Sequence, residues 1–198
     1  MASDEGCPDK ANVASEHVHV SLWGFKNCPW VSPESVAEAL ESLPRHLLTG
    51  LRNIRYEPVP LAPGMYSWVT APAQSRLYGL YSQEDRTILV QGVKNRVDLF
   101  RVLFHELGHH IYFSVLLSEE KKHWVVNLWG SEDAVSSYGK RNAAEDFAEL
   151  FSLFLMGSSK LHDRPVKTRF LRDTVLRNAH FKSQLLRDVV YQKASQKT

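Results

Sequence analysis

The feature that most constrains this chain is the stretch from Val97 to Leu117, VDLFRVLFHELGHHIYFSVLL, which is apolar on nearly every side of a helix. Such a segment is expected to form a central, buried helix. It nevertheless carries His105, Glu106 and His109 in its middle. Because buried polar groups cost free energy unless they are paired, these three side chains must have partners in the fold.

The three residues form the pattern H-E-x-x-H. Histidines at positions i and i+4 share one helix face, so both imidazoles can reach a single zinc ion at about 2.0–2.1 Å. Glu106 then lies beside the metal, where it can act as a base on bound water. The alternative is a chance match in which both histidines are hydrogen-bonded core residues. Gly108 indicates tight packing around this helix, which favours the zinc interpretation.

Length and composition set outer limits on the fold and its partners. A chain of 198 residues, 43% of them hydrophobic, can bury a sizeable core and is expected to form one domain. With 24 basic and 22 acidic side chains, the net charge of +2 argues against nucleic acid or a membrane as partner. The first residues lack the pattern of a signal peptide, so we expect a cytoplasmic protein. Whether Cys7 and Cys28 pair stays open, as does the oligomeric state.

We predict a disordered tail over residues 1–16, a domain over 17–192 and a frayed tail over 193–198. The patterns indicate an α+β fold with a small mixed or antiparallel sheet beside the metal. The expected early elements are a strand at 17–25, a helix from Ser32 to Leu43, a short turn at 44–49, a strand at 51–59, and a hairpin of residues 76–81 and 87–91.

Asn95 is expected to cap the H-E-x-x-H helix, and a short helix should follow at 121–128. Asn142 is expected to cap a later helix that ends at Gly157, with Glu145 and Glu149 one turn apart on a face away from its phenylalanines. From Leu161 onward, one or two basic amphipathic helices are expected. Trp124 and Trp129 are interpreted as core or lid residues.

A catalytic zinc ion usually takes three protein ligands, so His105 and His109 need a partner. The extended motif with a third histidine is excluded, because Tyr112 and Val115 occupy its glycine and histidine positions. Glu145 and Glu149 are the main candidates, and Asp133 is a weaker one. The alternative for Glu145 is a helix-capping role with Asn142.

The order H-E-L-G-H, then Ser137-Tyr138, then N-A-A-E-D-F-A-E from Asn142, resembles the Pro-Pro endopeptidase and anthrax lethal factor catalytic domain group. In that group a tyrosine precedes the zinc-binding glutamate by seven residues, and a second acid follows one turn later. The resemblance implies a zincin-like fold, Glu145 as third zinc ligand, Glu149 as partner of a zinc-binding histidine, and Tyr138 as oxyanion donor. It also implies cleavage next to proline.

The sequence therefore predicts a zinc-dependent endopeptidase of gluzincin type that acts on a protein or peptide, with Glu106 as general base. A peptide substrate could add as an extra strand to the second strand of the hairpin, formed by Thr87, Ile88, Leu89, Val90 and Gln91. One alternative is a cytosolic regulatory metallopeptidase that cuts a repressor or stress protein. Another is a binding module whose zinc is structural and is closed by His123 or Asp133.

Overall fold

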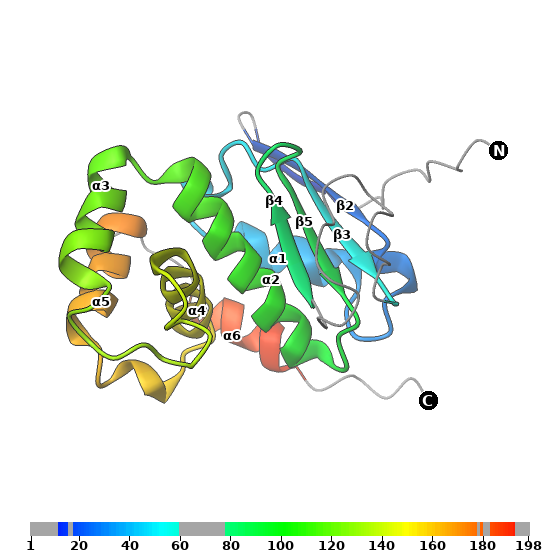
Figure 1. Cartoon of the computed structure of the whole chain (residues 1–198). Coiled ribbons are helices and arrows are strands. Elements are labelled where there is room, and N and C mark those ends of the chain that lie inside the picture. Colours follow the sequence, from blue (N-terminus) through cyan, green and yellow to red (C-terminus); the bar gives the residue numbers. More distant parts are fainter. Residues whose placement is uncertain (1–11, 16–17, 60–77, 178, 180–182, 193–198) are drawn as a thin grey trace.

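The computed structural model describes residues 12–15, 18–59, 78–177, 179 and 183–192. Its sheet has five strands in the order β1-β2-β3-β5-β4 (Figure 1). β2, β3 and β5 run parallel, whereas β1 and β4 are antiparallel to their neighbours at the two ends of the sheet. The fold is thus mixed α/β with a mixed sheet, as predicted. The strands are β1 (Asn12–Ser15), β2 (Val18–Trp23), β3 (Asn53–Glu57), β4 (Gly79–Ser82) and β5 (Thr87–Gln91).

The predicted hairpin is confirmed: β4 pairs with β5 in antiparallel register, with Ser82 opposite Thr87. The prediction that residues 87–91 form an edge strand is wrong, because β5 pairs with β3 on one side and with β4 on the other. All five of its residues are buried. The run TILVQ is typical of a central strand covered on both faces rather than of an edge.

The N-terminal boundary of the domain also differs from the prediction. Asn12–Ser15, expected within a disordered tail, forms β1 and pairs with β2. With only four residues, N-V-A-S, this strand gives little pattern to recognise, and its place at the sheet edge depends on main-chain hydrogen bonds. The remainder of the expected tails, residues 1–11, 16 and 193–198, lies outside the described residues, as does the pairing of Cys7.

Most expected helices are confirmed, and side chains cap them as predicted. Ser32, Asn95 and Asn142 each accept a hydrogen bond from the backbone N–H three residues later. The α-helices are α1 (Pro33–Glu41), α2 (Arg96–His110), α3 (Ser118–His123), α4 (Ala143–Leu155), α5 (Pro165–Phe170) and α6 (Ser183–Tyr191). The shorter 3₁₀ and π segments are η1 (Phe25–Asn27), η2 (Arg45–Leu48), η3 (Ile111–Val115), η4 (Trp124–Leu128), η5 (Ser159–Leu161) and η6 (Leu171–Val175).

Helix α2 occupies the centre of the molecule, between the sheet and α4 (Figure 1). It contacts β4 and β5 on one side and α4 on the other. A Cβ atom at Gly108 would lie only 2.7 Å from the Cα atom of Ala148, so the glycine allows α2 and α4 to approach closely. Phe147 and Phe151 of α4 are completely buried, as is Trp124. Among the described residues, no helix is long and apolar enough to cross a membrane.

Candidate metal centre

The α2–α4 contact brings together the three residues predicted as metal ligands. Nε2 of His105 lies 3.2 Å from Oε2 of Glu145, and Nε2 of His109 lies 3.3 Å from the same oxygen. One donor atom from each residue falls within 4.8 Å of the other two. In the described part of the chain, this is the only such group of His, Cys, Asp or Glu side chains.

The geometry of this triad suits a metal ion. Donor atoms held by a tetrahedral zinc ion at about 2.0–2.1 Å lie roughly 3.3 Å from one another, which matches both nitrogen–oxygen distances. Oε2 of Glu145 is buried and makes no hydrogen bond with a described residue. A buried acceptor of this kind needs a cation or a donor. Two imidazoles and one carboxylate also form a donor set that zinc favours.

Without an ion, two residues of the triad have strongly shifted pKa values. Burial would lower the pKa of His105, but the carboxylates of Glu145 and Glu149 outweigh it and raise that pKa to about 9. Burial would likewise raise the pKa of Glu145, but its contacts with His105 and His109 lower it to about 2. The metal-free site therefore holds a proton that a bound cation would displace.

Glu149, one turn after Glu145, approaches the other ring nitrogen of His105. Its Oε1 lies 3.3 Å from Nδ1 of His105 and 4.0 Å from Nη2 of Arg101. Its carboxyl is buried, and although burial alone would raise its pKa, the contact with His105 lowers it. Glu149 is thus ionised and stands beside the ring nitrogen opposite to the one that faces Glu145.

Glu106 lies between the two histidines and is only 6% exposed. Burial raises the pKa of its carboxyl, while the charges of His109 and His105 act in the opposite direction. A Cβ atom at Gly79 would lie 2.5 Å from Oε1 of Glu106, so β4 can pass beside this carboxyl only because residue 79 has no side chain. Sequence reasoning missed Gly79, since its effect depends on a contact between a strand and a distant helix.

Tyr138 lies at the edge of the site, in the loop before α4. Its ring centroid is 5.8 Å from that of His105, and Cζ of Arg141 sits 4.3 Å from the centroid of the tyrosine ring. Burial raises the pKa of the Tyr138 phenol, and the charges of Glu145 and Glu106 raise it further. The hydroxyl is therefore protonated at neutral pH and acts as a hydrogen-bond donor to Glu145.

A cavity of about 560 Å³ opens over Glu106 and His105. None of the residues 87–91 lines it, so the predicted substrate-binding role of Thr87, Ile88, Leu89, Val90 and Gln91 is wrong as stated: their backbone is already paired on both sides. Gly79 of β4 and its neighbour Tyr78 line the cavity instead. Among the described residues, the lining is Tyr78, Gly79, Val93, Lys94, Asp98, Arg101, Val102, His105, Glu106, Tyr138, Arg141 and Glu149.

Two other candidate ligands, His123 and Asp133, do not join the triad. Nδ1 of His123 pairs with the side-chain amide of Asn127. Asp133 is exposed, and its backbone carbonyl accepts a hydrogen bond from Arg164. His110, next to the motif, is completely buried and contacts the Tyr81 hydroxyl at 3.0 Å, away from the triad.

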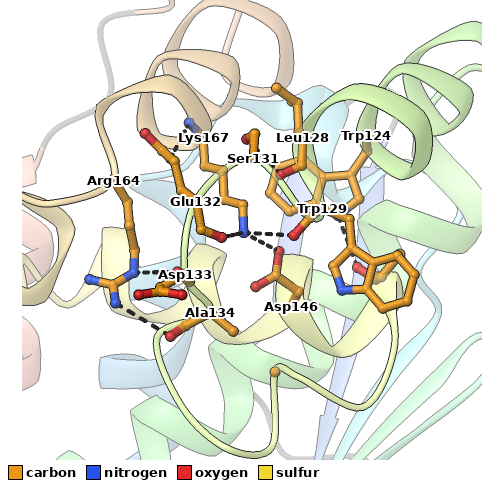
Figure 2. Close-up of polar contacts among 12 residues, drawn as sticks. Trp124, Leu128, Trp129, Ser131, Glu132, Asp133, Ala134, Asp146, Arg164 and Lys167 are labelled. Atoms are coloured by element: carbon orange, nitrogen blue, oxygen red, sulfur yellow. Dashed lines mark hydrogen bonds and ion pairs between the residues drawn. The ribbon is translucent and has the colours of Figure 1, made fainter.

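A buried ion pair anchors the loop that leads to Tyr138 (Figure 2). Lys167 of α5 is fully buried, and its ammonium lies 2.9 Å from Oδ2 of Asp146. The same ammonium donates to the carbonyls of Trp129 at 3.2 Å and Glu132 at 2.9 Å. Glu132 in turn accepts the N–H groups at the start of α5. The base of the loop is thereby fixed to both α4 and α5.

Comparison with known proteins adds no family assignment: no protein-family model matches the chain, and no curated protein matches it significantly. The function must therefore be inferred from the chemistry of the site.

Proposed function

We propose that the protein is a zinc-dependent endopeptidase of gluzincin type. The observation that carries the proposal is the convergence of His105, His109 and Glu145. Of this triad, His105 lines an open cavity, together with Glu106. We further propose that the fold is zincin-like, with α2 as active-site helix and α4 as the helix that supplies the glutamate ligand.

When bound, zinc would lower the pKa of a coordinated water toward neutrality and polarise the scissile carbonyl. His105, His109 and Glu145 would hold the ion through Nε2, Nε2 and Oε2. Glu106 would accept a proton from the attacking water and deliver it to the leaving amine, a role that its raised pKa supports. Tyr138 would donate a hydrogen bond from its hydroxyl group to the oxyanion that develops on the substrate.

Glu149 would accept the Nδ1–H group of His105 and so present Nε2 of that ring as the ligand atom. For the substrate, we propose the edge of β4 in place of β5. In the described part of the sheet, β4 has a strand partner on one side only, and Gly79 lines the cavity. On the other side the backbone of Tyr81 is hydrogen-bonded to Glu106. An extended peptide could pair with β4 at Gly79 and pass over Glu106.

The alternative of a structural zinc closed by four side chains has less support, because neither His123 nor Asp133 lies near the triad. A cytosolic regulatory peptidase would share the chemistry proposed here and differ only in its substrate. Cleavage next to proline rests on the sequence resemblance alone.

The test is cleavage-site profiling of the zinc-loaded protein on a mixed peptide library that includes proline-proline sequences, with Glu106→Gln as control. We expect cleavage by the parent protein, none by the variant, and one zinc ion bound by both. Absence of cleavage by folded, zinc-loaded protein would contradict the proposal. Loss of zinc from Glu106→Gln would show that Glu106 is a ligand instead of a base.

A further inference from the structure

The rim of the cavity carries three basic side chains that the proposed catalytic chemistry does not use. Lys94 comes from the loop after β5, Arg101 from α2 and Arg141 from the loop before α4. They belong to segments far apart in the sequence, yet all three line the same cavity. The fold therefore gathers positive charge around the opening.

Arg101 is placed by helix geometry. It precedes His105 by one turn of α2, so both side chains lie on the helix face that forms the cavity. Its side chain is 56% exposed, and its carboxylate neighbour, Glu149, is at the long distance of 4.0 Å. The pairing with Glu149 thus leaves the guanidinium open to a further anion.

Arg141 is held by its stacking on Tyr138, with its Cζ atom 4.3 Å from the ring centroid. A guanidinium stacked on an aromatic ring keeps its N–H groups in the plane, where they can still bind a carboxylate. The base of this loop is fixed by Lys167, as Figure 2 shows. Arg141 is therefore presented from an anchored segment.

The three acids that line the cavity offset the positive charge of this rim only in part. Asp98 accepts a hydrogen bond from the side chain of Asn95 at 2.7 Å, and Glu149 contacts His105. Glu106 lies on the floor and is nearly inaccessible. The neutral amide leaves the charge of Asp98 in place, whereas Glu149 and Glu106 are buried. Because all three basic side chains are exposed, the accessible rim keeps an excess of positive charge.

We propose that this cavity selects peptides with an acidic side chain next to the bond to be cleaved, bound by Arg101 and Arg141 with a contribution from Lys94. The placement of the acidic side chain next to the cleaved bond rests on the proposed function. The recognition of an acidic peptide by the cavity does not depend on cleavage and can be measured separately.

The test uses Glu106→Gln loaded with zinc and three fluorescent decapeptides that differ only in a central Glu, Gln or Lys. Anisotropy titrations at low salt should give about tenfold tighter binding of the Glu peptide than of the Gln peptide, because two or three partly exposed charge pairs add up to that factor. The preference should shrink as salt is raised.

Adding Arg101→Glu or Arg141→Glu should abolish the preference, and the double change should favour the Lys peptide. Lys140→Glu is the matched control: it makes the same charge change one residue from Arg141, at an exposed position that does not line the cavity. Lys140→Glu should keep most of the preference for the Glu peptide over the Gln peptide. Circular dichroism would establish that each variant is folded.

Equal binding of the Glu and Gln peptides, or an equal loss with Lys140→Glu and Arg141→Glu, would overturn the inference. Cleavage without any acidic preference would overturn it as well and leave the proposed function intact. If the Glu peptide binds selectively but the zinc-loaded parent protein cleaves no peptide, the proposed function is refuted and an acid-binding cavity is supported.

Discussion

The buried ion pair between Lys167 and Asp146 allows a quantitative prediction for the variant Lys167→Met. Methionine is of similar length and apolar, so it can occupy the same space without the charge. It would leave the carboxylate of Asp146 buried without its cation and remove the donor shared by the carbonyls of Trp129 and Glu132.

Removing one partner of a buried pair costs about 3–5 kcal/mol, since the remaining charge loses its compensation. For a domain of this length, each kcal/mol lowers Tm by roughly 2–4 °C, so a decrease of about 6–20 °C is expected. Burial raises the pKa of Asp146 even with Lys167 present. In the variant the folded protein should bind a proton more readily, so the destabilisation should be smaller at pH 5 than at pH 8.

Urea unfolding of metal-free protein would measure these free energies without a contribution from zinc binding. The double variant Lys167→Met, Asp146→Leu should be more stable than Lys167→Met alone, because it removes the orphaned carboxylate. Lys140→Met, at an exposed position of the same loop, should change stability by less than about 0.5 kcal/mol. A change below about 1 kcal/mol in Lys167→Met would refute the reasoning.

Three further predictions concern the metal centre and its surroundings. In a titration against a zinc chelator, Glu145→Ala should lose zinc at concentrations that leave the parent loaded, whereas Glu149→Gln should weaken zinc binding by about 10–100-fold; the reverse order would exchange their roles. Tyr138→Phe should lower kcat by about 10²–10³ with unchanged zinc content, and near-normal kcat would reduce Tyr138 to a structural role. Burial lowers the pKa of His110 from 6.5 to about 4, so the folded state binds fewer protons than the unfolded state between these values. The contribution of His110 to the free energy of unfolding of metal-free protein should therefore fall by about 3 kcal/mol as pH decreases from 6.5 to 4. It is measured as the difference in slope between the parent and His110→Gln, and an equal slope in the variant would contradict the assignment.

The parts of the site that lie within single helices could be predicted from sequence, because helix periodicity fixes the relative positions of their side chains. His105 and His109 share a face of α2, and Glu145 and Glu149 both turn toward it from α4. The capping residues Asn95 and Asn142 also follow from local chemistry, since each accepts a hydrogen bond from an N–H only three residues away.

Features that depend on contacts between distant segments could not be predicted in this way. The hairpin of β4 and β5 was recognisable, but the pairing of β5 with β3 is a contact between segments far apart in the sequence. Residues 87–91 lie inside the sheet because their nearly continuous apolar run is buried on both faces. The basic rim formed by Lys94, Arg101 and Arg141 likewise exists only after three segments have met.

The absence of a side chain at Gly108 couples the packing of α2 and α4 to the metal centre. Facing helices usually lie 8–10 Å apart, at a distance set by the side chains between them, and a Cβ at residue 108 would already be 2.7 Å from the backbone of Ala148. Glu145 is one turn from Ala148 on the same helix, and its side chain has a fixed reach. Zinc ligands tolerate deviations of about 0.2 Å, so moving α4 outward by even an ångström would take Oε2 of Glu145 out of bonding range. The glycine inside H-E-L-G-H therefore helps to hold Glu145, the proposed third ligand, within reach of His105 and His109.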